Sequence, residues 1–242
     1  MIGAIVGDVV GSRFEWNNIK TKNFEFIVDF SRPTDDSVMT LAIAAAIIEC
    51  NDNFENLEAN AIKWMQRIGN IYPNYGYGGS FRHWLKSNNP QPYNSWGNGS
   101  AMRVSPCAYA SDNLEEVLAL SDSVTKVTHN HEEGIKGARA TTEAIFLART
   151  GVGKKEIGNA LEKYYDLNFT LNDIREDYEF DVSCQGSVPQ AIKAFLESND
   201  FEDAIRNAIS IGGDSDTIAA ITGSIAEAYY GVPDNIRVQI EK

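Results

Sequence analysis

The chain has 242 residues, 43% of them hydrophobic, which is typical of one globular domain with a substantial core. Its formal charge of −13 excludes a general binder of the nucleic-acid backbone, which needs a basic surface, but not a small anionic ligand held by backbone amides or metal ions. Three cysteines without a CxxC pair predict reduced thiols in a cytoplasmic protein, and we expect neither a signal peptide nor a membrane-spanning segment.

The first predicted helix covers residues 2–14, which are mostly small and apolar. Three of its residues share a spacing of four and would form one stripe that another helix can approach closely: Gly3, Gly7 and Gly11. We interpret Asp8 as a buried hydrogen-bonding acid. Glu15 stands at the helix end, where the helix dipole disfavours a carboxylate, and this favours a functional role for it.

An acidic cluster precedes the second predicted helix. Residues 17–33 are polar and are expected to form a loop, after which the run Thr-Asp-Asp-Ser at residues 34–37 heads the almost wholly apolar segment 38–48. One aspartate would suffice to cap a helix. Two carboxylates at the start of a buried helix need more positive charge than the helix dipole supplies, so the cluster favours metal binding over capping alone.

Two glycine-rich segments occupy the middle of the chain. Gly76-Tyr77-Gly78-Gly79 enters a predicted helix at Phe81, and Gly97-Asn98-Gly99-Ser100 opens another helical pattern. Glycine amides at a helix start can bind an anion, although such a run is more commonly a simple turn. Further helices are predicted at residues 54–68, 114–128, 132–149 and 154–165.

His129 and His131 form a His-x-His pair without a third partner nearby, so we favour hydrogen bonding or ligand contact by His129 over metal ligation. Residues 185–189 are expected to interrupt the chain before a helix that runs to Leu196. Another helix is predicted at 201–211, and a short final helix lies within 232–242.

A second acidic cluster follows Gly212-Gly213 and contains Asp214, Asp216 and Thr217. It heads residues 218–226, which carry no charge and therefore indicate another buried helix. Strand patterns are almost absent, and no repeat of 20–50 residues occurs. The sequence thus predicts one all-α domain with about ten or more helices.

If the fold brings the two acidic clusters together, they offer six hard oxygen ligands: Thr34, Asp35, Asp36, Asp214, Asp216 and Thr217. Such ligands favour Mg²⁺, Mn²⁺ or Ca²⁺ over zinc or copper, and four carboxylates match the charge of two divalent cations. Positions would remain open for water and substrate hydroxyls. The residues alone indicate a binuclear hydrolase, with phosphoester hydrolysis as the default reaction.

In combination and in order, these motifs resemble the ADP-ribosylglycohydrolase family, which includes dinitrogenase reductase-activating glycohydrolase. The matching segments are Gly7–Gly11 with Glu15, the two acidic clusters and the two glycine-rich segments. The resemblance implies an orthogonal multi-helix bundle over residues 1–242 with two Mg²⁺ or Mn²⁺ ions. It also implies hydrolysis of the glycosidic bond between ADP-ribose and a macromolecular acceptor, through protein arginine or serine.

The resemblance assigns a role to individual residues as well. Glu15, Asp35 and Asp36 would be catalytic, and the six oxygen ligands named above would hold the metals, which would bind the distal ribose hydroxyls and position water. Seven residues would contact the substrate: Gly76, Gly78, Gly79, Asn98, Gly99, Ser100 and His129. We expect a monomer.

Two other functions stay open. One is a binuclear phosphohydrolase of nucleotides or sugar phosphates, and the other is a non-catalytic relative that binds ADP-ribose. The polar loop at residues 17–33 is expected to cover the site and to set the choice of acceptor.

Overall fold

The computed structural model describes residues 1–241, which form twelve α-helices and three 3-10 helices. In chain order these are α1 (Ile2–Gly11), α2 (Asp35–Cys50), η1 (Phe54–Asn56), α3 (Leu57–Ile71), α4 (Gly79–Leu85), η2 (Asn98–Ser100), η3 (Ser105–Tyr109), α5 (Leu114–Lys126), α6 (Glu132–Arg149), α7 (Lys154–Leu161), α8 (Leu171–Ile174), α9 (Cys184–Leu196), α10 (Phe201–Ile209), α11 (Ser215–Tyr230) and α12 (Asp234–Ile240). The strand-type pairing within these residues is a single isolated bridge between Gly97 and Ser183. The predicted all-α fold is confirmed.

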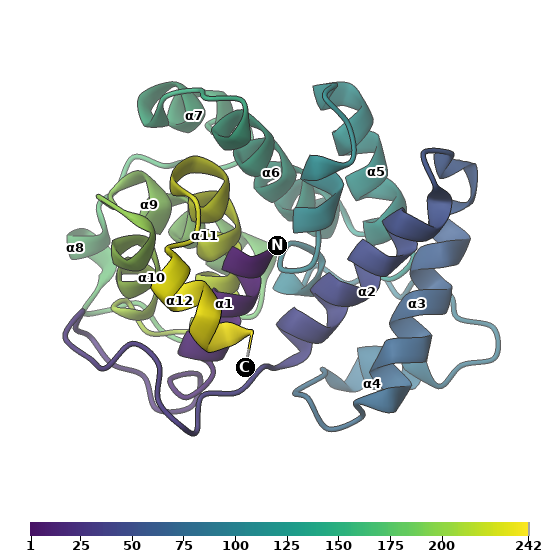
Figure 1. Cartoon of the computed structure of the whole chain (residues 1–242), viewed down its shortest axis with the longest axis horizontal. Coiled ribbons are helices and arrows are strands. Elements are labelled where there is room, and N and C mark those ends of the chain that lie inside the picture. The colour runs from purple at the N-terminus through teal and green to yellow at the C-terminus, as the bar shows by residue number, and fades with distance from the viewer. Residues whose placement is uncertain (242) are drawn as a thin grey trace.

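Helices α1 and α11 lie against each other at the centre of the molecule (Figure 1). Their backbones touch, because a Cβ at Gly7 would overlap the carbonyl of Ala219, and a Cβ at Gly3 would overlap that of Gly223. At the end of α1, a Cβ at Gly11 would lie 2.6 Å from the Cα of Asp216. The predicted glycine stripe is confirmed, and it brings the end of α1 onto the first turn of α11.

The remaining helices surround this central pair. Helices α9 and α10 pack on α11, α6 contacts both α9 and α11, and α2 packs on α3 (Figure 1). The long segment between α1 and α2 contains no helix, as predicted, and runs along the lower edge in Figure 1. Across the described residues, no helix has both the length and the apolar character needed to cross a membrane.

Two predictions about local structure are wrong. Residues 185–189 do not interrupt the chain but lie inside α9, which Ser183 caps by accepting a hydrogen bond from the amide of Gly186. Pro189 removes one helical hydrogen bond, to the carbonyl of Gln185, an exposed residue in the first turn of α9.

The segment after Gly97 forms η2 and η3 rather than a continuous helix. Pro106 lies at the start of η3, where its missing amide costs least. The other predicted helices are present with ends shifted by a few residues, except that Lys242 lies outside the described part of the chain.

Candidate functional site

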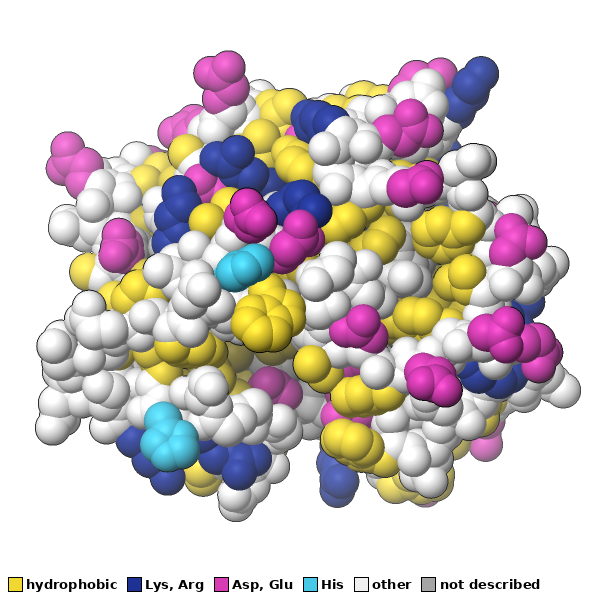
Figure 2. Space-filling model, turned by 180° about the vertical axis from the view of Figure 1, so that it is seen from behind, with side chains coloured by type: hydrophobic (Ala, Val, Ile, Leu, Met, Phe, Trp, Pro, Cys, Tyr) yellow, Lys and Arg dark blue, Asp and Glu magenta, His cyan; other side chains and the backbone are white. Residues whose placement is uncertain are grey.

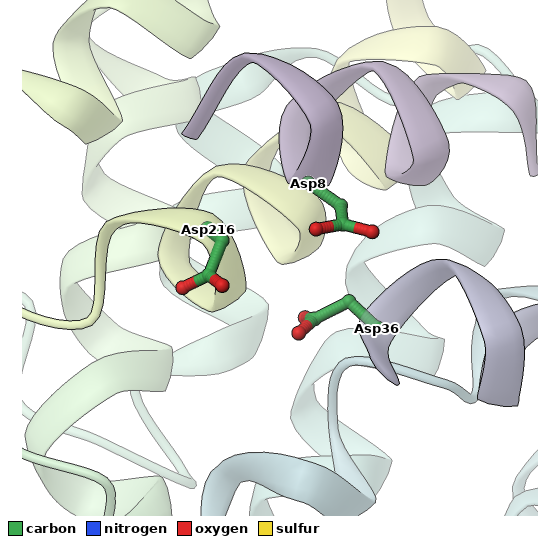
Figure 3. Close-up of side chains that lie close together, drawn as sticks. All are labelled: Asp8, Asp36 and Asp216. Atoms are coloured by element: carbon green, nitrogen blue, oxygen red, sulfur yellow. The ribbon is translucent and has the colours of Figure 1, made fainter. Parts of the chain in front are cut away.

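Three buried aspartates from three helices meet beside the central helix pair (Figure 3). Asp8 comes from α1, Asp36 from α2 and Asp216 from α11, and one carboxylate oxygen of each lies within 4.8 Å of the others. The hydroxyl of Thr217 donates a hydrogen bond of 3.2 Å to Asp36. The two acidic clusters, far apart in the sequence, therefore lie at one point in the fold.

Asp8 holds the start of α2 in place. Its carboxylate accepts hydrogen bonds from the amide and hydroxyl of Thr34, at 2.9 and 2.7 Å, and from the amide and hydroxyl of Ser37. Burial raises the pKa of Asp8, and these hydrogen bonds oppose that rise. These contacts agree with the interpretation of Asp8 as a buried hydrogen-bonding acid.

A second group of carboxylates adjoins the first. Oxygens of Glu15, Asp214 and Asp216 lie within 4.8 Å of one another, so Asp216 belongs to both groups. The side-chain amide of Asn98 donates a hydrogen bond of 2.7 Å to Asp214. Burial raises the pKa of Asp214 to about 6, and burial together with the charge of Asp216 raises the pKa of Glu15 to about 7.

Asp35 lies on the side of the site that faces the first glycine-rich segment. Gly76 has a φ of +99°, and a Cβ there would lie 2.8 Å from Oδ1 of Asp35. Burial, followed by the charges of Asp216 and Asp8, raises the pKa of Asp35 well above its ordinary value. Glycine at position 76 thus permits both the left-handed backbone and the close approach to Asp35.

The cluster has the properties of a divalent-cation site. Within residues 1–241, no lysine or arginine forms an ion pair with any of these carboxylates. The Oδ1 atom of Asp36 is buried and accepts no hydrogen bond. Unpaired buried carboxylates are costly unless a cation compensates them, and carboxylate and hydroxyl oxygens are ligands that Mg²⁺, Mn²⁺ and Ca²⁺ prefer.

A cavity of about 570 Å³ opens beside the cluster. Figure 2 shows this face, where acidic and hydrophobic side chains lie around a hollow near the centre. The lining includes most of the residues that the sequence singled out: Glu15, Asp35, Asp36, Asp214, Asp216, Thr217, Gly76, Gly78, Gly79, Asn98, Gly99 and His129.

Thr34 and Ser100 are not part of the cavity lining. Thr34 caps α2, and its hydroxyl donates to Asp8. Ser100 is fully buried behind the wall, where its hydroxyl donates a hydrogen bond of 2.8 Å to the carbonyl of Gly134.

The two histidines of the His-x-His pair have different environments. Nε2 of His129 faces the second glycine-rich segment, where a Cβ at Gly99 would lie 3.5 Å away. Burial, with a smaller effect of Arg103, lowers the pKa of His129 well below its ordinary value and keeps the ring neutral. His131 instead caps α6 by accepting a hydrogen bond from the amide of Glu133. No histidine joins the carboxylate groups within the described residues.

Several cavity residues were not found from the sequence. Trp16 and Phe180 stack with their ring centroids 5.1 Å apart, and they are 75% and 42% exposed. Trp16 could have been noticed because it follows Glu15, whereas Phe180 lies in an irregular polar segment without a pattern. Arg103 also contributes to the lining, but its guanidinium donates to the carbonyl of Val124 near the end of α5.

The model of the family described as ADP-ribosylglycohydrolase matches residues 1–242. Together with the helical fold and the carboxylate-lined cavity, this match defines a hydrolase of the ADP-ribosylglycohydrolase class. The chain therefore belongs to the ADP-ribosylglycohydrolase family.

Individual relatives span almost the whole chain. It is 26% identical to the ADP-ribosylhydrolase ARH3 of Xenopus tropicalis, over 100% of this chain and 89% of that protein. It is also 26% identical to the ADP-ribosylarginine hydrolase Tri1 of Pseudomonas putida (strain GB-1), over 96% of this chain and 70% of that protein.

A solved chain described as "ADP-ribosylglycohydrolase-related protein complex" has the same fold, with a TM-score of 0.73 and 24% identity. The match covers 99% of this chain and 92% of the solved chain.

Proposed function

We propose that this protein removes ADP-ribose from a modified macromolecule by hydrolysing the ribosyl glycosidic bond at a site with two divalent cations, Mg²⁺ or Mn²⁺. The observation that carries the proposal is the meeting of two acidic clusters beside one cavity in a member of this family. The names of the relatives, an ADP-ribosylhydrolase and an ADP-ribosylarginine hydrolase, support the choice of bond.

Six residues would hold the cations: Thr34, Asp35, Asp36, Asp214, Asp216 and Thr217. The hydroxyls of Thr34 and Thr217 donate their protons to Asp8 and Asp36. The oxygen of Thr34 also accepts from the amide of Asp36, so it keeps one lone pair for a cation, whereas that of Thr217 keeps both. When bound, the cations would offset the charge of the carboxylates and orient water and ribose hydroxyls.

Glu15 is the strongest candidate for proton transfer. Its carboxyl lines the cavity beside Asp214 and Asp216, where it can give a proton to a leaving group or accept one from water. In the metal-free site burial and the charge of Asp216 raise its pKa to about 7, and bound cations would lower that value. Asp35 and Asp36 would act beside it. In a conventional glycosidase two carboxyl groups share this work, whereas here the metal centre would take over part of one carboxylate's role.

The two glycine-rich segments would bind the ADP-ribose. Apart from adjacent residues of the chain, no atom lies within 4 Å of where a Cβ would stand at Gly78 or Gly79, so a diphosphate can approach their backbone. Neutral amide donors explain how a chain with a charge of −13 holds an anion. Asn98, Gly99 and His129 would contact the ribose and phosphates, with Ser100 supporting the segment from behind.

The cavity favours arginine over serine as the acceptor. The aromatic pair Trp16–Phe180 lines it, and a planar guanidinium packs on an aromatic face, whereas a serine hydroxyl gains nothing from one. The carboxylates do not add to this preference, because the proposed cations would compensate four of the five.

An activity panel tests the proposal. Arginine-, serine- and nucleic-acid-linked ADP-ribose are incubated with the protein and Mg²⁺ or Mn²⁺, and free ADP-ribose and inorganic phosphate are measured. We expect ADP-ribose to be released, fastest from arginine. Phosphate release would support the binuclear phosphohydrolase instead, and binding of ADP-ribose without turnover on any acceptor would support a non-catalytic relative.

A further inference from the structure

We propose that Asn18 is a positioning residue, whose side-chain amide holds the Glu15 segment against the turn that carries Asp214 and Asp216. The catalytic part of this inference rests on the proposed function. The structural part, that one amide ties the segment between α1 and α2 to the start of α11, does not.

The side chain of Asn18 makes hydrogen bonds in both directions to the same residue. Its Nδ2 donates to the carbonyl of Gly213 at 2.9 Å, and its Oδ1 accepts from the amide of Gly213 at 2.7 Å. The carbonyls of Phe14 and Glu15 also lie within hydrogen-bond distance of this Nδ2, at 2.6 and 3.0 Å, so its two N–H groups are shared among three carbonyls. One amide therefore joins the backbone of Glu15 to the residue just before Asp214.

The Gly213 turn is shaped for this contact. Gly212 and Gly213 have φ values of +72° and +77°, a conformation that disfavours other residues. Lys20 adds a second attachment: its Nζ donates at 2.7 Å to the carbonyl of Ile211, two residues before Gly213. The same Nζ also donates to the carbonyl of Tyr178 at 2.6 Å, and Arg206 holds the segment further along, through the carbonyls of Lys22 and Phe24. The Asn18 contacts are therefore the ones that join the Glu15 end of the segment to the Gly213 turn.

The attachment holds Glu15 close to two other carboxylates. Oxygens of Glu15, Asp214 and Asp216 lie within 4.8 Å of one another, and like charges at such distances repel. Glu15 lies on a non-helical segment, so repulsion alone would move it toward water. The Asn18 contacts oppose that movement and keep the Glu15 carboxyl at the cavity.

A double-mutant cycle distinguishes positioning from simple support of the fold. The variants are Asn18→Ala, Glu15→Gln and the double variant, with Asn17→Ala as a control on the neighbouring exposed residue of the same type. We expect Asn18→Ala to lower kcat about 10- to 100-fold with little change in KM, as loss of a supporting hydrogen bond or a small misplacement does. In the Glu15→Gln background, Asn18→Ala should lower kcat only slightly further.

The conservative variant Asn18→Asp sharpens the test. It keeps the acceptor for the Gly213 amide but loses the donors and adds a negative charge, so it should be as impaired as Asn18→Ala. An equal loss of kcat from Asn18→Ala in both backgrounds, or full activity of Asn18→Asp, would overturn the inference.

Hydrogen exchange of the metal-free protein gives a readout that does not depend on activity. In Asn18→Ala the Gly213 amide and the amides of residues 12–20 should exchange faster, while the rest of the chain and the Asn17→Ala variant keep wild-type rates. If the wild type released no ADP-ribose, the proposed function would be wrong. The hydrogen-exchange result would still show whether Asn18 attaches the Glu15 segment to the Gly213 turn. Uniformly faster exchange would mean that Asn18 only stabilises the fold, and unchanged exchange would mean that it holds nothing; either result contradicts the inference.

Discussion

At the scale of single residues, Glu15 lines the cavity in surroundings that disfavour its charged form. Burial and the neighbouring Asp216 raise its pKa to about 7. We predict that Glu15→Gln lowers kcat about 10²- to 10⁴-fold, the usual contribution of proton transfer by a positioned side chain. The variant should melt no lower than the wild type, because it removes one of several mutually repelling carboxylates.

Glu25→Gln is the matched control, since Glu25 is an exposed glutamate in the same segment between α1 and α2. It should keep wild-type activity. If Glu15→Gln also retained full activity on every substrate, Glu15 would have no part in the reaction.

The sequence predicted residues whose chemistry conflicts with their neighbours. Asp214 and Asp216 stand out because two carboxylates head an uncharged helix, and Asp35 and Asp36 stand out for the same reason. Phe180 could not be predicted, because its role depends on a stacking partner that is distant in the sequence.

Asn18 gave no signal either, since an asparagine in a polar loop is ordinary. Its importance comes from hydrogen bonds to Gly213, which only the fold brings within reach.

At the scale of elements, the α1–α11 contact sets the position of the acidic cluster. A Cβ at Gly7 would overlap backbone atoms of Ala219, which cannot move without shifting a helix. We predict that Gly7→Ala lowers the free energy of unfolding by about 1–3 kcal/mol, the usual cost of overpacking. It should also weaken Mn²⁺ binding, because Asp8 and Asp216 would move apart.

Gly158→Ala on α7 is the control, because the nearest atom to its Cβ would be a side-chain carbon of Leu196 at 3.4 Å. There alanine should be neutral or stabilise the protein by about 0.5–1 kcal/mol through its higher helix propensity. Urea unfolding and Mn²⁺ calorimetry measure both variants. Equal stabilities for the two variants would contradict the close α1–α11 packing.

The elements themselves were mostly predictable because their apolar residues recur at helical spacing. The glycine stripe even indicated the close contact of α1, although not its partner. Pro189 misled the prediction, since a proline inside a helix is uncommon and removes a helical hydrogen bond. Helix boundaries set by a single cap, such as Ser183 for α9, carry too weak a pattern to outweigh a proline.

At the scale of the whole molecule, the carboxylates that meet at the centre should make stability depend on cations. Removing the cations leaves carboxylates from α1, α2 and α11 facing one another without compensation. We predict a lower Tm in chelator than with Mg²⁺ or Mn²⁺, measured by calorimetry. Identical melting curves would count against a shared site.

The same carboxylates predict an unusual pH dependence for the metal-free protein. The folded-state pKa values of Asp214, about 6, and Glu15, about 7, exceed their ordinary values of 3.8 and 4.5. Between these values the folded carboxyl groups bind more protons than the unfolded ones, and the raised pKa values of Asp35, Asp36 and Asp216 act in the same direction. The lowered pKa of His129 acts in the opposite direction, but it is one group against five, so the free energy of unfolding decreases as the pH rises. The metal-free Tm should therefore be higher near pH 5 than near pH 8.

Added Mg²⁺ or Mn²⁺ should weaken this trend, because cations compensate the carboxylates in place of protons. Asp214→Asn should weaken it too, since one of the titrating groups is gone. A metal-free Tm that rises from pH 5 to pH 8 would contradict the raised pKa values.

The most direct measurement follows the products of ADP-ribosylated arginine peptide with saturating Mg²⁺ or Mn²⁺. It compares the wild type, the wild type in chelator, Asp214→Asn, and Asp234→Asn, which changes an exposed aspartate on α12. We predict that the wild type and Asp234→Asn release free ADP-ribose and no inorganic phosphate, while chelator and Asp214→Asn abolish the release. Full activity of Asp214→Asn, or activity unaffected by chelator, would contradict hydrolysis at this carboxylate cluster.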